Sequence, residues 1–133
     1  MTTHAATDRK SNIWREGAVA GAVAGAVCVL MWVVGNVAGL NWEVTQGGQT
    51  TDVLIFMPFI SAFISALVSL VVLWVLLKFG RGGWWKPIVG VVGLLSVAQP
   101  LVAATETSTG VVLALMHLVV AGVMVTMVHP PSR

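Results

Sequence analysis

His117 lies inside a long apolar segment near the end of the chain, and three carboxylates border the apolar segments around it. Imidazole gains or loses a proton near neutral pH and can donate or accept a hydrogen bond. The carboxylates are Glu43, Asp52 and Glu106. Glu106 precedes His117 by eleven residues, close to three helical turns, so both point the same way if one helix carries them. This set predicts a polar ligand site or acid–base chemistry.

Six further side chains are candidates for ligand binding, because they are polar or aromatic and stand within or beside apolar segments. They are Trp32, Asn36, Trp42, Ser65, Ser96 and Gln99. At about 1.5 Å per helical residue, Ser65 and Ser96 fall at the depth of His117, and Asn36 and Gln99 lie nearer the carboxylates. The pattern predicts a tapering polar cavity that opens at the carboxylate end.

Each of these residues also has a purely structural interpretation. A histidine inside an apolar segment usually faces other helices, where it can bond a serine or a carbonyl of a neighbouring helix. Both roles stay open for His117. Asp52 and either Thr107 or Thr109 have the residue type and position of helix N-caps. The other two acids can be solvated loop carboxylates.

Four apolar segments must position these residues: 17–40, 53–77, 87–104 and 110–128. A helix of about 20 apolar residues crosses the hydrocarbon core of a bilayer. Only 9% of the residues are charged, against about 25% in soluble domains. We therefore expect an all-α fold, a transmembrane four-helix bundle over 17–128. Residues 1–16 and 129–133 are expected to be cytoplasmic tails, the first twelve disordered.

The basic residues give an orientation. All seven lie before the first apolar segment, between the second and third, or after the fourth; they are Arg9, Lys10, Arg15, Lys78, Arg81, Lys86 and Arg133. Basic residues in short loops stay cytoplasmic. We expect both termini inside, a multi-pass protein of the plasma membrane, and 40–52 and 105–109 outside. The first segment exceeds the apolar length of a signal peptide.

Small residues in the first apolar segment predict close helix packing. Gly17, Gly21 and Gly25 recur at every fourth position, which lets two helix backbones approach in lipid. A contact with another helix of the same chain is favoured over a dimer interface. Pro100, directly after Gln99, is expected to interrupt the third helix.

Several chemistries are excluded by the residues available. The chain has one cysteine, and its other histidines lie in the two tails, so His117 cannot belong to a standard zinc site. No phosphate-binding loop, nucleophile elbow or zinc-protease motif occurs. The net charge is only +2, and all seven basic residues lie in the loops and tails expected to be cytoplasmic. We expect no metal, no cofactor and no nucleic acid partner.

Three segments carry a resemblance to a known family: LLSVAQPL at 94–101, the threonine-rich loop 105–109 and ALMHLV at 114–119. They resemble an uncharacterised family of small four-helix membrane proteins common in actinobacteria. That family shows a Ser-x-x-x-Pro-Leu end to its third helix and a Met-His pair in its fourth. These match Ser96, Pro100, Leu101, Met116 and His117. The resemblance implies the topology and points to His117, but implies no activity.

Two functions remain from the sequence. The first is a binding or accessory protein whose polar cavity holds a lipophilic small molecule. The alternative is an intramembrane isomerase or cyclase acting on a terpenoid or polyketide, with His117 moving the proton and the carboxylates assisting. Binding is favoured because no acid–base pair is adjacent. The expected partners are membrane lipids and, through the bundle, a second copy or a larger membrane complex.

Overall fold

The computed structural model describes residues 3–130 and, for residues 3–11, only their backbone. The described elements are, in order, α1 (Thr3–Val37), β1 (Glu43–Gln46), β2 (Gln49–Asp52), α2 (Met57–Lys78), the 3₁₀ helix η1 (Gly82–Trp84), α3 (Trp85–Ser96), α4 (Ala98–Ala103) and α5 (Thr107–Met127). The fold is therefore mostly helical.

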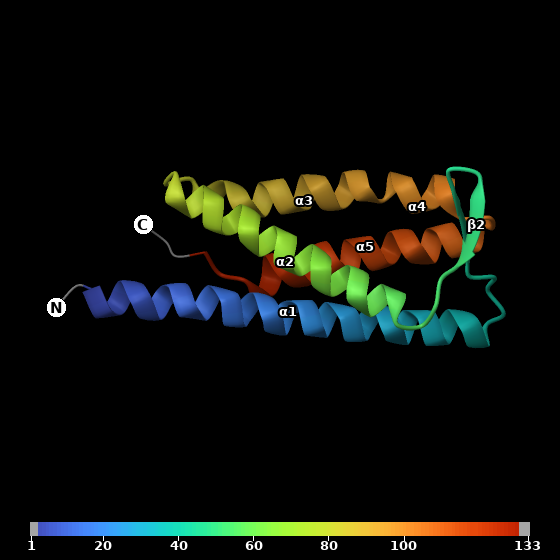
Figure 1. Ribbon diagram of the computed structural model, residues 1–133, viewed down its shortest axis with the longest axis horizontal. Helices are drawn as coiled ribbons and strands as arrows, with labels where there is room; N and C mark the ends of the chain where they lie inside the picture. The colour runs from blue at the N-terminus through green and yellow to red at the C-terminus, as the bar shows by residue number, and fades with distance from the viewer. Residues whose placement is uncertain (1–2, 131–133) are drawn as a thin grey trace.

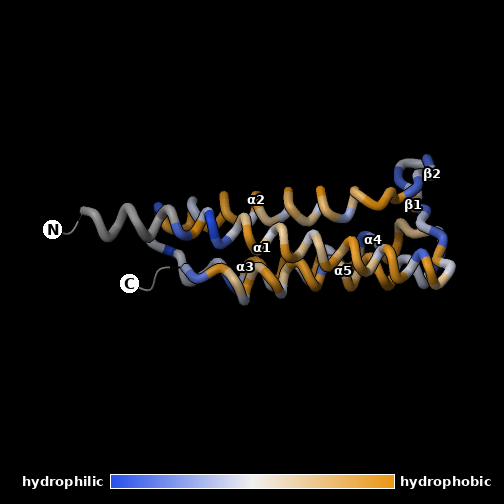
Figure 2. Tube along the Cα trace, turned by 90° about the horizontal axis from the view of Figure 1, so that it is seen from below, coloured by the Kyte–Doolittle hydropathy of each residue, from blue (hydrophilic) through white to orange (hydrophobic). Residues whose placement is uncertain are grey.

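Four helical stretches are long and apolar enough to cross a membrane: Asn12–Val37, Met57–Lys78, Gly82–Ala103 and Thr107–Met127. The helices run along the long axis of the molecule, with both termini at one end and the strands at the other (Figure 1). These ends are called the terminus end and the hairpin end. Polar residues gather at the two ends and apolar residues between them (Figure 2). The expectation of four apolar helical spans is confirmed.

The amino-terminal residues differ from the expectation. A helix already begins at Thr3 and continues without interruption to Val37. The segment expected to be disordered contains alanine, arginine and lysine, which are good helix formers. Once the apolar part of α1 is helical, the helix extends backwards through these residues at no new nucleation cost.

The connection between α1 and α2 is a β-hairpin, which corrects the all-α expectation. Glu43 lies opposite Asp52, and Gln46 lies opposite Gln49. Gly47 and Gly48 both have positive φ, 59° and 80°, as a two-residue hairpin turn of type I′ requires. Asp52 therefore ends a strand and does not cap a helix.

The third span is broken, as Pro100 predicts. α3 ends at Ser96, Val97 separates the two helices, and α4 begins at Ala98. Pro100 has no amide hydrogen for the carbonyl of Ser96 four residues earlier, and its ring crowds that carbonyl. The break lies between mid-height and the hairpin end of the bundle.

The predicted contact of the α1 glycines with another helix of the chain is present in the α1–α2 pair. A Cβ atom added at Gly21 would lie 2.9 Å from the Cβ atom of Ala66, and one added at Gly25 would lie 2.6 Å from the ring of Phe59. α5 packs against α1 on one side and against α3 and α4 on another. Toward the hairpin end, α2 diverges from α3 and α4 (Figure 1).

Candidate functional site

His117 is half-buried on α5 and bonds its own helix. Its Nδ1 lies 2.8 Å from the carbonyl oxygen of Leu113. A carbonyl only accepts hydrogen bonds, so Nδ1 carries the hydrogen and Nε2 of the neutral ring presents a lone pair. Nε2 has no hydrogen bond to the part of the chain whose side chains are described, residues 12–130. The expected structural role, a bond to a facing helix, is therefore not observed.

His117 lies on the side of α5 that faces α3 and α4. Gly110 of α5 abuts Pro100, and Ala121 abuts Gly93. His117 is seven residues after Gly110 and four before Ala121, so all three share one face of the helix. Because the two contacts fix an antiparallel register, His117 is level with Ser96 and Val97, where the third span breaks.

Ser96 contributes a second hydrogen-bond acceptor at this level. Its hydroxyl donates to the carbonyl of Gly93 at 2.7 Å and is thereby occupied. Its carbonyl lacks the helical donor that residue 100 would supply if it were not proline. The break in the third span and the free nitrogen of His117 thus place two acceptors on facing helices.

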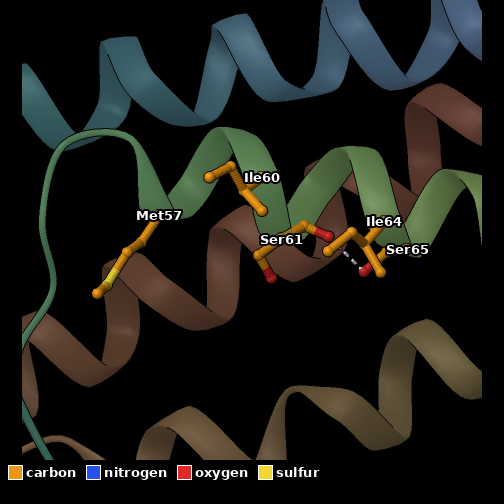
Figure 3. A pocket seen from close by; sticks show the side chains of 5 residues that line it. All are labelled: Met57, Ile60, Ser61, Ile64 and Ser65. Carbon is orange, nitrogen blue, oxygen red and sulfur yellow. Dashed lines mark hydrogen bonds between the residues drawn. The ribbon is translucent and has the colours of Figure 1, made fainter.

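α2 borders the same level with an open groove about 390 Å³ in volume, lined by Met57, Ile60, Ser61, Ile64 and Ser65. These side chains lie on the face of α2 away from α1, and the Ser65 hydroxyl donates to the Ser61 carbonyl at 2.8 Å (Figure 3). The groove opens sideways, not at the hairpin end. Its lining is mostly apolar, with two serines at helical spacing.

The groove is connected to α5 through the core beside it. Ala62 of α2 packs in one cluster with Met116, the residue before His117. Leu113 and Val120, one turn to either side of His117, pack against the same cluster. His117 therefore stands at the seam between the α2 side and the α3–α4 side of α5.

Trp32 and Trp42 occupy the hairpin end of the interior, where the opening of the predicted cavity was expected. Their rings stack at 5.6 Å between centroids. Trp32 donates its indole hydrogen to the carbonyl of Val53 at 2.8 Å. Trp42 is only 6% exposed, and its indole nitrogen has no partner among the described residues. Both rings are packing residues of the core.

The remaining predicted ligand residues lie elsewhere. Asn36 is exposed in the last turn of α1, and Gln99 is exposed on α4. The six candidates therefore do not line one cavity. Ser65 lines the lateral groove, Ser96 lies at the end of α3 beside the helix break, and the two tryptophans form part of the core.

The three carboxylates gather at the hairpin end, away from His117. Glu43 faces Asp52 across the hairpin, and its carbonyl accepts hydrogen bonds from the amide and the hydroxyl of Thr105, the residue before Glu106. Glu106 is the exposed N-cap residue of α5, without a side-chain capping bond. About 16 Å of helix separates it from His117. The expected acid–base set is not assembled.

Two features were missed by sequence reasoning. Leu113 is the hydrogen-bond partner of His117, and its position four residues earlier on the helix was the available signal. Ser61 joins Ser65 in the groove, again at a spacing of four. Among the side chains of residues 12–130, no three histidines, cysteines or acids come together as a metal site.

Comparison with known proteins gives a family and no further relative. No curated protein and no solved structure matches the chain. Residues 8–133 match a family of unknown function, DUF6069, so the match includes the four spans, the hairpin and the helix break. An uncharacterised family is what the motifs around Ser96 and His117 implied. The chain belongs to the DUF6069 family of unknown function.

Proposed function

We propose that this is a multi-pass plasma-membrane protein that binds a lipophilic molecule, as a binding or accessory protein. Its ligand lies at the level of His117, on the side of the bundle between α2 and the α3–α4 break, with α5 behind it; this side is called the open flank. The ligand enters sideways from the bilayer, where α2 diverges from α4. Both termini are cytoplasmic, because the basic residues of the described chain lie at the terminus end.

The observation that carries the proposal is the hydrogen bonding of His117. An ionisable side chain at this depth costs free energy and is usually retained for a function. His117 does not join two helices, because its one protein bond returns to Leu113 of its own helix. Its Nε2 is therefore available to a molecule that is not part of the chain.

Binding is favoured over the alternative of an intramembrane enzyme. An isomerase or cyclase needs a proton donor and a proton acceptor on either side of its substrate. Glu43, Asp52 and Glu106 lie at the hairpin end, and Glu16 lies near the terminus end. None of these described carboxylates lies near His117, so His117 has no carboxylate partner for proton transfer among them.

Native mass spectrometry of the protein purified in a mild detergent tests this proposal. We expect the wild type to retain a mass of lipid size that His117→Leu loses. His129→Leu is the matched control, because His129 is exposed beyond the end of α5. Equal retention by wild type and His117→Leu would refute the binding site.

The orientation has a separate test. A cysteine is introduced at Gly82, in the connection between α2 and α3, on a Cys28→Ala background. We expect it to react with a membrane-impermeant thiol reagent only after cells are opened. A cysteine at Gly48, in the hairpin turn, is expected to react in intact cells. The reverse pattern would contradict cytoplasmic termini.

A further inference from the structure

We infer that the ligand of this flank is a neutral lipophile that carries a hydroxyl or similar hydrogen-bond donor, bound by donating to Nε2 of His117. The inference rests on the proposed function and names the chemistry of its ligand. A lipophilic ligand of this kind must carry one polar group, and that group must be a hydrogen-bond donor.

The tautomer of His117 determines the direction of the hydrogen bond. Nδ1 must donate, since its partner is the Leu113 carbonyl at 2.8 Å. The neutral ring then offers only a lone pair at Nε2. A ketone, an ester or an ether cannot bond to this nitrogen, whereas a hydroxyl or an amide N–H can.

The facing helix reinforces the same preference. The Ser96 carbonyl, level with His117, has no donor from residue 100 because that residue is proline. The Ser96 hydroxyl is already donated to Gly93. Nε2 of His117 and the Ser96 carbonyl, which lie at one level on facing helices, are both acceptors, and two acceptors cannot satisfy each other without a donor.

The placement of charge favours a neutral ligand. The charged side chains of the described residues lie toward the two ends of the bundle: Arg15, Glu16, Lys78, Arg81 and Lys86 at the terminus end, Glu43, Asp52 and Glu106 at the hairpin end. The groove on α2 is lined by three apolar residues and two serines. A charged headgroup would find no counter-charge here and would remain desolvated at a high cost.

Lateral entry is indicated by which side of the bundle is open. Trp32 and Trp42 fill the interior at the hairpin end, whereas Ile60 and Ile64 of the groove are 49% and 54% exposed. An apolar chain can lie along this exposed face of α2 while its hydroxyl reaches the seam. The same lipophile would not reach His117 from the aqueous side without displacing both indole rings.

A pair of photoreactive probes tests the inference. One is a long-chain alcohol with a diazirine and a terminal alkyne, and the other is its methyl ether, each added to nanodiscs that contain the full chain. Cyanogen bromide cleaves after methionine, so the hairpin falls in fragment 32–57, the helices α2, α3 and α4 in fragment 58–116, and His117 in fragment 117–124. Labelling of the last two fragments can therefore be measured against that of the first. We expect the alcohol to label about 3-fold to 10-fold more than the ether.

Variants separate this inference from the proposed function. His117→Leu should abolish the preference for the alcohol, and His117→Gln should retain part of it, because the amide oxygen still accepts. His129→Leu should change nothing. Equal labelling by both probes, reduced in parallel by Ser65→Leu, would leave a lipophile site but overturn the hydroxyl requirement. No labelling of either fragment above that of the hairpin by either probe would overturn the site itself.

Discussion

The two faces of α2 differ in how closely they are packed. The face toward α1 carries Ala62, Ala66 and Leu70, each at most 3% exposed, against the small residues of α1. The opposite face carries Ile60 and Ile64, about half exposed, and the two serines of the groove. One helix therefore joins a close-packed pair on one side and leaves an open flank on the other.

This difference shows which helix contacts stabilise the fold. In lipid, helices gain little from hiding apolar surface, so close backbone approach and dispersion contacts supply the attraction. The α1–α2 face makes such contacts where Gly21 and Gly25 approach Ala66 and Phe59. The open face leaves its polar groups to their own helix, as the Ser65 bond to Ser61 shows, and remains free for a molecule from outside the chain.

The largest expected effect is at the close-packed face. Gly21→Leu should lower the free energy of unfolding by about 3 kcal/mol, because a Cβ atom there would already lie 2.9 Å from the Cβ atom of Ala66. Gly122→Leu on α5 is the matched control, since open space surrounds that position. Thermal unfolding in detergent provides the measurement. Equal losses in both variants would contradict the close packing of α1 against α2.

A smaller effect is expected where the two sides of the bundle are joined at the terminus end. Trp85 is fully buried, and its indole N–H donates to the carbonyl of Ser69 on α2 at 3.0 Å. Trp85→Phe should therefore cost about 1 kcal/mol. The neighbouring Trp84 is 65% exposed, so Trp84→Phe should change stability by less than about 0.5 kcal/mol. The same unfolding assay would show whether this order is reversed.

The smallest effect on stability is expected at the proposed site. His117→Leu removes one bond within a single helix, so unfolding should shift by no more than about 0.6 kcal/mol. Thr109→Val is the control, because it also removes one side-chain hydrogen bond. The buried Thr109 hydroxyl donates to the Asn41 carbonyl at 2.6 Å and so joins α5 to the residues after α1. That variant should cost more. A larger loss in His117→Leu would assign this histidine to packing.

The sequence was sufficient for the spans and for the glycine contacts, because both are local patterns. Length and apolarity decide whether a helix can cross a bilayer, and Gly17, Gly21 and Gly25 form a stripe whatever their partner is. The sequence could not identify the helix that packs against this stripe, because that depends on tertiary packing. The break at Val97 was predictable from Pro100, since the missing amide hydrogen acts on the same helix.

The site was harder to predict because it depends on side-chain direction and helix tilt. Depth alone could not show that the groove opens sideways. Trp32 and Trp42, predicted from the sequence as ligand residues, have their rings stacked on each other, an arrangement that the sequence could not reveal. The hairpin was missed although Gly47 and Gly48 stand between short polar and β-branched runs, a recognised hairpin signal.

The hairpin also joins parts of the protein that are far apart in the sequence. The strand β1 contacts the end of the third helical stretch, because Val44 bridges to Ala104 and the Glu43 carbonyl accepts hydrogen bonds from Thr105. The paired strand β2 leads directly into α2. The hairpin therefore tethers the start of α2 to the end of α4, and its length limits how far the open flank between these helices can widen.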